Sequence, residues 1–193
     1  ILDSANVLSA LVVAGGEEPG EATRLGLRWL VSRQDSTGSW GTFVPDTTLR
    51  NDGPCPYVTA ACVETLLDSG AAAGDPAVRR GLAWLLGQQR PDGTYEALWY
   101  RGPVPGTAMA LAALSRAGMA DHPAARRARA ALLKAQLPDG SWGPGDTGVL
   151  GDDPAGTVEE TAWAVRALLA SGMPVDDPRI RQGAAAIVSA QCQ

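Results

Sequence analysis

RQDSTGSWG, residues 33–41, returns twice further along the chain, as QQRPDGTYE from Gln88 and as AQLPDGSWGP from Ala135. Each copy places a Gly four residues after a Gln and an aromatic residue two residues after that Gly. Asp and Gly are typical of a chain reversal, but a reversal requires neither the Gln nor the aromatic residue. The three copies therefore indicate one repeated structural unit rather than three unrelated turns.

Each Gln closes a pair of segments with helical patterns. The first segments share a Ser or Thr followed by Ala, apolar residues at helical spacing and a closing Gly, which is typical of a helix C-terminus. They cover residues 3–15, 58–70, 106–118 and 160–172. The second segments end at the Gln and cover residues 24–34, 79–89, 127–136 and 181–191. We therefore expect four helical hairpins.

The spacing within the hairpins is nearly constant. The Ser or Thr precedes the Gln by 30, 30, 29 and 30 residues, and a small residue stands eight residues before each Gln, at Gly26, Gly81, Ala128 and Gly183. A fixed period of about 50 residues is typical of architectures in which each unit packs on its neighbours. The sequence therefore predicts an all-α fold in one repeat domain, residues 1–193, with repeats at approximately 1–50, 51–100, 101–150 and 151–193. We expect this domain to be a fragment of a longer chain.

The spacing that the three turns share suggests a structural role for the Gln and the aromatic residue. A Gln amide can both donate and accept, so it can bond free carbonyls at its own helix end and amides at the start of a neighbouring helix. The aromatic residue can cover those bonds and keep water away. We assign this role to Gln34, Gln89, Gln136, Trp40, Tyr95 and Trp142.

Composition narrows the classes of protein and partner. With 193 residues, 45% of them apolar, the chain is long enough to bury a core. A net charge of −5 without a long basic run argues against binding nucleic acid. Three scattered cysteines suggest a reducing compartment, and no run of 18 apolar residues predicts a transmembrane segment. We expect a cytoplasmic protein, at most peripheral to a membrane.

The motif RLGLRWLVSRQDSTGSWG, residues 24–41, resembles the QW motif of squalene–hopene cyclases and other class II terpene cyclases. RRGLAWLLGQQRPDGTYE, residues 79–96, matches as well, with Tyr95 in the Trp position. The third copy keeps QLPDGSWG but lacks the Gly and the aromatic residue of the helix. The fourth copy contains the helix and its Gln, in AQCQ, but not the turn that follows. The resemblance implies a partial α/α toroid, in which the first helix of each hairpin lines a cavity and the second forms an outer layer.

The toroid also serves other functions, so the architecture does not settle the activity. A protein prenyltransferase needs Asp, Cys and His on zinc; here the only His, His122, falls in a loop, and Cys62 suits a small core position. The GCGEQ signature of thioester domains is absent. A glycosidase needs facing carboxylates, for which the helix-mouth acids Asp3, Glu159 and Glu160 are unspecific candidates.

A class II cyclase protonates an alkene or epoxide with a carboxylic acid that is kept protonated. The family places this acid in a DxDD motif just before a Thr-Ala pair at an inner-helix mouth. No complete DxDD occurs here: ILDSA keeps only the last Asp, Asp3, whereas TVEETA has Glu159 in the middle position and Glu160 in the last. Adjacent carboxyls can raise one another's pKa, which makes Glu159 the favoured acid. The alternative for all three residues is helix capping.

Four aromatic residues stand near the expected mouths of the inner helices, where they could face developing carbocations. Tyr57 precedes the second of these helices, Trp99 and Tyr100 precede the third in a Pro-rich loop, and Trp163 lies one turn into the fourth. The alternative for each of them is core packing.

These observations favour a domain like a class II terpene cyclase, an isomerase or lyase of isoprenoid biosynthesis that acts on or binds an isoprenoid. The alternative is a non-catalytic toroid that binds an isoprenoid or a protein partner. Protonation needs no cofactor, and Mg²⁺ is expected only with a diphosphate substrate. Closing the toroid would require self-association or a flanking segment.

Overall fold

The computed structural model describes residues 1–15, 20–43, 53–145 and 155–191. This part of the chain forms eight α-helices and, apart from the isolated bridges Gly41–Pro54 and Trp142–Thr157, no β-structure. The helices are α1 (Leu2–Ala14), α2 (Glu21–Ser32), α3 (Pro56–Asp68), α4 (Pro76–Gln88), α5 (Val104–Arg116), α6 (Pro123–Ala135), α7 (Val158–Ala170) and α8 (Pro178–Gln191). The predicted all-α fold is confirmed.

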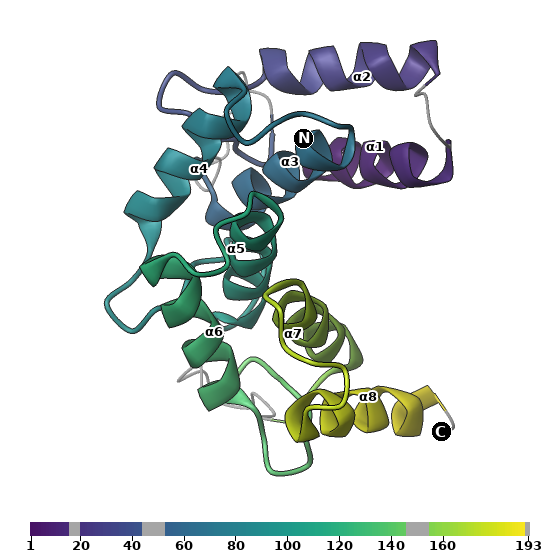
Figure 1. Ribbon diagram of the computed structural model, residues 1–193, viewed down its shortest axis with the longest axis vertical. Coiled ribbons are helices and arrows are strands. Elements are labelled where there is room, and N and C mark those ends of the chain that lie inside the picture. Colours follow the sequence, from purple (N-terminus) through teal and green to yellow (C-terminus); the bar gives the residue numbers. More distant parts are fainter. Residues whose placement is uncertain (16–19, 44–52, 146–154, 192–193) are drawn as a thin grey trace.

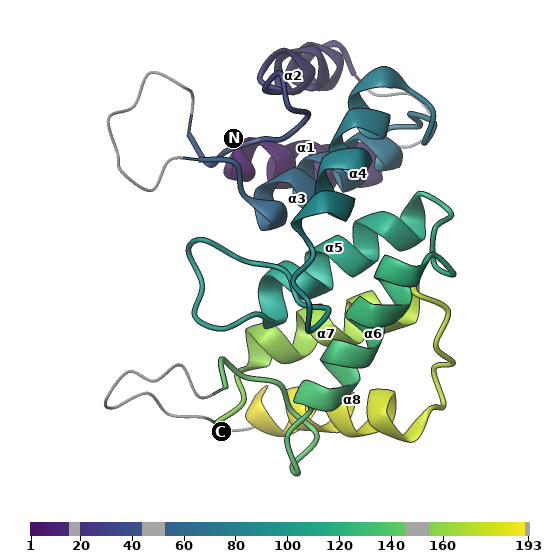
Figure 2. The same ribbon diagram turned by 90° about the vertical axis from the view of Figure 1, so that its left-hand side faces the viewer.

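The helices form two layers of an open arc (Figure 1). α1, α3, α5 and α7 pack side by side in chain order as the inner layer, and α2, α4, α6 and α8 each pack on the inner helix that precedes them. The inner helices all begin at the same end of the molecule, where the connection from α4 to α5 also lies (Figure 2). The first helix of each hairpin is therefore inside and the second outside, as the resemblance implied.

Local chemistry sets the helix ends. Pro stands within the first turn of α3, α4, α5 and α6, where its missing N–H costs no helical hydrogen bond. Gly70, Gly118 and Gly172 follow the last turns of α3, α5 and α7 with φ of 94°, 78° and 89°. Side chains rarely adopt this left-handed region, so Gly is suited to end these inner helices.

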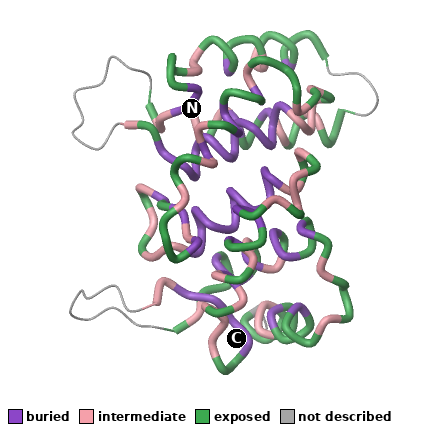
Figure 3. Tube along the Cα trace, turned by 60° about the vertical axis from the view of Figure 1, so that its left-hand side comes forward, coloured by how far each residue is buried: buried purple, intermediate pink, exposed green. Residues whose placement is uncertain are grey.

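The two central inner helices hold most of the core (Figure 3). Residues 56–66 of α3 and 104–114 of α5 are buried without interruption. Both helices have an inner neighbour on each side and an outer helix behind them, so a one-sided apolar stripe would not suffice. Ala is frequent in this core, which lets the helix axes approach closely.

The three Gln–aromatic turns, residues 34–40, 89–95 and 136–142, link successive outer helices. Gln34 Nε2 donates to the carbonyl of Gly38 at 2.9 Å and to the carbonyl of Ala77, at the start of α4, at 2.8 Å. Gln89 and Gln136 repeat both bonds, to the carbonyls of Gly93 and Ala124 and of Gly140 and Arg179 respectively. We predicted that each Gln would bond backbone amides at the start of the neighbouring helix. This prediction is wrong, because the Gln side chain donates to a backbone carbonyl there.

The aromatic residue of each turn is buried between an outer and an inner helix. The indole N–H of Trp40 donates to the Leu30 carbonyl at 2.8 Å, and that of Trp142 donates to the Leu132 carbonyl at 2.7 Å. The Tyr95 hydroxyl has no hydrogen-bond partner among the described residues. The backbone N–H of each aromatic residue donates to a Thr hydroxyl on an inner helix, so the turn joins the two layers.

In the described ranges, no helix is long and apolar enough to cross a membrane.

Candidate functional site

One face of the inner helices lines a cavity of about 400 Å³ on the concave side of the arc. The helices can be aligned on the hydroxyl residue near their start, which we call the anchor: Ser4, Thr59, Thr107 and Thr161. The residues two positions after the anchor all line the cavity, namely Asn6, Ala61, Met109 and Trp163. So do Ser9, Glu64 and Arg166, five positions after it. A spacing of three residues places these positions on one helix face. The position four after the anchor lies against the outer helix instead, at Leu8, Val63 and Val165.

Three aromatic rings meet at the mouth end of the cavity. Tyr57 at the start of α3, Tyr100 in the loop before α5 and Trp163 in the first half of α7 all line it. The ring centroids of Tyr57 and Tyr100 are 5.1 Å apart, those of Tyr57 and Trp163 5.6 Å, and those of Tyr100 and Trp163 4.9 Å. These separations are those of interacting aromatic pairs. Burial, followed by the hydrogen bond with Tyr100, raises the pKa of Tyr57 well above its usual range.

An ion pair between a buried carboxylate and a half-exposed guanidinium crosses the middle of the cavity. Nη1 and Nη2 of Arg166 on α7 donate to the two carboxylate oxygens of Glu64 on α3, both at 3.0 Å. Glu64 is buried, whereas the Arg166 side chain is 48% exposed. Arg166 Nη2 also lies 3.1 Å from the Met109 sulfur of α5, between the two partners. Burial alone would lower the pKa of Arg166, but the hydrogen bond to Glu64 and the Glu64 charge raise it above its ordinary value, so the guanidinium stays charged.

A second ion pair lies one turn beyond the first. Arg116, nine positions after the anchor of α5, bonds Asp68, nine positions after the anchor of α3. Ser9 of α1 donates to the other Asp68 oxygen at 3.1 Å. The cavity therefore has an aromatic end at the helix mouths and a polar end deeper along the helices, where every charge has a partner.

The structure separates the two adjacent glutamates that the sequence singled out. Glu159 is exposed and lines the cavity beside Trp163. Glu160 is buried, and its carboxylate accepts from the Thr157 hydroxyl at 2.7 Å while its backbone N–H donates to that hydroxyl at 3.1 Å. This is a helix N-terminal capping arrangement. Burial raises the pKa of Glu160, and the charge of Glu159 adds to the rise, although the Thr157 bond opposes it.

Asp3 and Trp99 are not among the residues that line the cavity. Asp3 lies in the first turn of α1, whose N-cap is Ile1, and borders a different hollow between α1 and α2. Trp99 is 49% exposed, donates its indole N–H to the Thr42 hydroxyl at 2.6 Å, and meets the Phe43 ring edge-on at 5.9 Å. Of the seven candidates, the structure thus brings together Tyr57, Tyr100, Trp163 and Glu159.

Sequence reasoning missed the cavity's ion pairs, although a signal was present. Glu64 and Arg166 stand at the same distance from their anchors, and so do Asp68 and Arg116. Charged residues in the interior of otherwise apolar helices, repeated in one register, indicate a shared inward face.

His122, expected to be a solvated loop residue, caps α6, because its Nδ1 accepts from the Ala124 N–H at 3.2 Å.

Metal and thiol chemistry find no further support in the part of the chain that the structure describes. No three His, Cys, Asp or Glu side chains in it are grouped as a metal site. Cys62 is a free, fully buried thiol, and burial raises its pKa far above the usual value, which suits the predicted core role.

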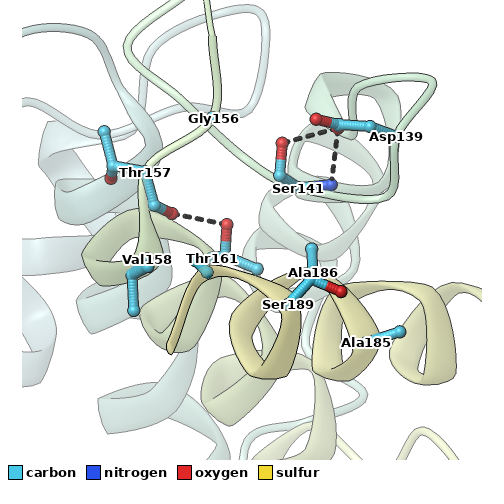
Figure 4. A pocket seen from close by; sticks show the side chains of 10 residues that line it. Asp139, Ser141, Gly156, Thr157, Val158, Thr161, Ala185, Ala186 and Ser189 are labelled. Atoms are coloured by element: carbon cyan, nitrogen blue, oxygen red, sulfur yellow. Dashed lines mark hydrogen bonds between the residues drawn. The ribbon is translucent and has the colours of Figure 1, made fainter. Parts of the chain in front are cut away.

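A second hollow, of about 390 Å³, lies between α7, α8 and the third Gln–aromatic turn (Figure 4). Three of its polar side chains, those of Asp139, Ser141 and Thr161, already have hydrogen-bond partners within the hollow. Asp139 accepts from the backbone N–H and the hydroxyl of Ser141, and Thr161 donates to the Thr157 carbonyl (Figure 4). These bonds lower the pKa of Asp139. The hollow therefore holds neither an acid that could donate a proton nor an aromatic wall.

The described geometry agrees with the comparisons to known proteins. A family model of the squalene–hopene cyclase C-terminal domain matches residues 1–193. The chain belongs to this family. Its sequence is 37% identical over 190 residues to the squalene–hopene cyclase of Alicyclobacillus acidocaldarius, covering 89% of this chain and 30% of that protein. It is 32% identical over 171 residues to the squalene–hopene cyclase of Zymomonas mobilis, covering 79% of this chain and 26% of that protein.

Solved structures support the fold of this squalene–hopene cyclase family member. The ent-copalyl diphosphate synthase from Streptomyces platensis matches 97% of this chain and 34% of its own, with a TM-score of 0.71 and 27% identity. The type II terpene cyclase MstE from Scytonema, in complex with merosterolic acid A, matches 98% of this chain with a TM-score of 0.51 and 17% identity. At this low identity the match supports the fold alone. The chain spans less than a third of the length of the two curated relatives named above.

Proposed function

We propose that this chain supplies part of the isoprenoid-binding wall of a class II terpene cyclase, in which protonation starts the cyclisation of a polyene. The observation that carries the proposal is the convergence of Tyr57, Tyr100 and Trp163 on one cavity of the inner face, in a member of the squalene–hopene cyclase family. Aromatic faces attract cations, and this attraction is what a cyclising carbocation requires.

Glu159 is the acid that we propose to act in this cavity if the chain contributes one. Glu159 lines the cavity and stands four residues before Trp163 on α7. Glu159 is exposed in the chain alone, whereas an acid of this type acts in a site closed to water. Glu160, whose pKa is raised, is already engaged with Thr157 as a cap. Mg²⁺ would enter only with a diphosphate substrate.

A cation-binding comparison tests the aromatic wall. We would titrate the chain with farnesylamine, which is protonated at neutral pH, and with farnesol, which has the same chain and no charge. Cation–π attraction of about 0.5–2 kcal/mol corresponds to about 2- to 30-fold tighter binding of the amine. Trp163→Leu should reduce this preference, and the matched change Trp84→Leu on the outer helix α4 should preserve it.

Because an exposed carboxylate also attracts an ammonium group, the comparison is repeated with Glu159→Gln. A preference for the amine that vanishes in Glu159→Gln and survives Trp163→Leu would show that the carboxylate, and not the aromatic wall, binds the cation. That result would overturn the proposal.

A non-catalytic isoprenoid-binding toroid is the second candidate, and the state of the cavity carboxylates favours it. Glu64 and Asp68 are paired with arginines, and Glu159 is exposed, so none of these three cavity carboxyls is both buried and without a cationic partner. We expect the 193-residue chain to give little or no cyclic product from squalene, farnesyl diphosphate or geranylgeranyl diphosphate. Robust turnover that survives Glu159→Gln would contradict both this expectation and the assignment of the acid.

A further inference from the structure

The inner helices α3 and α7 are joined across the concave face, although α5 lies between them. α3 packs on α5, and α5 packs on α7, along the arc (Figure 1). Two side-chain contacts nevertheless pass from α3 to α7. The rings of Tyr57 and Trp163 lie 5.6 Å apart. Glu64 accepts two hydrogen bonds from Arg166, both at 3.0 Å. One aromatic and one charged contact therefore bridge these second neighbours.

The aromatic contact and the charged contact stand in one register on each helix. Glu64 follows Tyr57 by seven residues on α3, which is about two helical turns. Arg166 follows Trp163 by three residues on α7, which is about one turn. Residues at these spacings share a helix face, and all four line the concave cavity. A rotation or a slide of α7 against α3 that broke the charged contact would therefore also move the two rings.

The chemistry of the pair makes it a directional contact. A guanidinium and a carboxylate that are joined by two parallel hydrogen bonds lie nearly in one plane, so the pair fixes an angle as well as a distance. The Met109 sulfur of α5 lies 3.1 Å from Arg166 Nη2 and contacts the guanidinium from the helix in between. Glu64 is buried, so its carboxylate has little access to water as an alternative partner. Three inner helices therefore meet at one guanidinium.

Stability alone is a poor explanation for a charge at this place. Glu64 is the only charged residue in the buried run 56–66 of α3. Replacing such a pair by apolar residues of similar size is often neutral or stabilising, whereas polar contacts that fix the register of two elements are well attested. Nor can Arg166 hold an anionic ligand with the two nitrogens of its fork, because both already bond Glu64. The pair is therefore suited to fix the geometry of the cavity.

We propose that Arg166 is a positioning residue of the cavity. Through its two bonds to Glu64 it holds α7 at the distance and the rotation relative to α3 at which the rings of Tyr57 and Trp163 meet. The ring of Tyr100, 5.1 Å from that of Tyr57 and 4.9 Å from that of Trp163, then completes the wall. The consequence for binding a cation rests on the proposed function, whereas the placement of the rings does not.

The second ion pair provides a matched control. Arg116 of α5 bonds Asp68 of α3, and its side chain is 47% exposed, close to the 48% of Arg166. Because α5 and α3 are direct neighbours in the arc, this pair adds nothing to the contact across α5. Asp68 also stands eleven residues after Tyr57, one turn further from the rings than Glu64. Loss of Arg116 should therefore remove an ion pair without displacing the rings.

The test follows the Trp163 ring by fluorine NMR of the chain labelled with 5-fluorotryptophan. The chain has six tryptophans, and Trp163→Phe identifies the resonance that belongs to this one. Arg166→Met keeps an unbranched side chain and removes the fork, so the Trp163 resonance should move toward the position of the free amino acid in water. Arg116→Met should leave it in place.

A double variant, Glu64→Leu together with Arg166→Met, avoids leaving the Glu64 carboxylate buried without a partner. It should keep the helical circular dichroism, because apolar replacements are tolerated at such a pair, and it should still displace the Trp163 resonance. It also permits the ligand comparison, since it leaves the net charge of the cavity unchanged. Its preference for farnesylamine over farnesol should fall from about 2- to 30-fold toward onefold.

Arg166→Lys is the variant that disturbs the fold least. It keeps a positive charge beside Glu64 without the two parallel bonds, so it should displace the resonance in the same direction but by less. The proposal would be overturned by a Trp163 resonance that stays in place in Arg166→Lys, or in the double variant while that variant remains folded. A displacement in Arg116→Met as large as in Arg166→Met would also overturn it.

Failure of the proposed function would look different. The chain without substitutions would then bind farnesylamine and farnesol equally, while the Trp163 resonance would still show whether Arg166 positions the ring.

Discussion

Replacing Trp142 by Ala should be among the most destabilising single changes in this chain. The side chain is fully buried, its indole N–H donates to the Leu132 carbonyl at 2.7 Å, and its ring lies against Gly183 of the next outer helix. It is therefore in contact with two successive outer helices and with the inner helix whose Thr161 accepts its backbone N–H. Truncation leaves a cavity where α6, α7 and α8 meet.

The expected magnitude follows from two losses. Removing a buried Trp side chain typically costs about 3–5 kcal/mol through lost transfer free energy and the remaining cavity. Leaving the Leu132 carbonyl without its partner adds about 1 kcal/mol, unless water enters the cavity and satisfies it. A domain of this size shifts its thermal midpoint by about 2–4 °C per kcal/mol, so a total loss of about 4–6 kcal/mol gives a fall of about 8–24 °C. A domain of ordinary stability would lose a large part of its free energy of unfolding.

The assay is unfolding by heat and by urea, followed by circular dichroism at helical wavelengths. Two control variants separate the contributions. Trp142→Phe keeps most of the ring and loses the indole N–H, so it should cost much less than Ala. Trp29→Ala removes the same side chain type from a position that is 37% exposed and should cost less than Trp142→Ala.

The reasoning would be refuted if Trp142→Ala kept the thermal midpoint of the unchanged chain within error. It would also be refuted if Trp29→Ala were as destabilising, because burial in the turn would then not decide the cost. Tyr95, at the same place in the second repeat, shows that an aromatic ring without the indole bond is tolerated there.

Three further changes test the charges and the buried phenol. Arg166→Ala should lower the free energy of unfolding by about 1–3 kcal/mol, less than for a fully buried pair, because Glu64 remains buried while Arg166 is half exposed; an unchanged urea midpoint would contradict it. Burial raises the pKa of Glu160, so the folded state binds its proton more tightly, and stability from this group falls as pH rises from the ordinary value of 4.5 through the raised one. Glu160→Gln should remove this dependence of stability on pH, which urea midpoints measured across the pH range would show. If the dependence instead disappears in the control Glu159→Gln, the assignment to Glu160 is wrong. Burial raises the pKa of Tyr95 to about 12, so the stability that the neutral phenol contributes should be lost between about pH 10 and 12. Tyr95→Phe should remove a phenolate absorbance step near pH 12, and a step that persists in the variant would refute the assignment.

The repeat turn explains why so much of the fold could be predicted from the sequence. Gln34, Gln89 and Gln136 recur at one spacing because each makes the same two bonds, within its turn and to the next outer helix. A contact between neighbours in a repeat leaves a periodic trace, because every unit must satisfy it. The order of the hairpins then follows, since each turn can reach only the helix that comes next.

The cavity could be predicted only in part, because its residues come from different helices and no single segment contains them. Tyr57, Tyr100 and Trp163 approach each other across three inner elements, and their meeting depends on the curvature of the arc. The partnership of Glu64 with Arg166 spans 102 residues of sequence. Sequence distance carries no information about such a pair unless both residues are first placed in the register of their helices.

The anchor residues connect the outer turns to the cavity, because their hydroxyls accept from the turn and their helices line the cavity. Thr161 accepts the N–H of Trp142 from the outer turn, and Trp163, two residues further along α7, lies on the cavity face. Thr59 is held in the same way by Trp40 and stands two residues after Tyr57. Each bond fixes both the depth and the rotation of an inner helix at its mouth, because a rotation that moved the hydroxyl would break it. The position of the aromatic rings in the cavity is therefore determined from the outer layer, which explains why a motif outside the cavity lining recurs with such constant spacing.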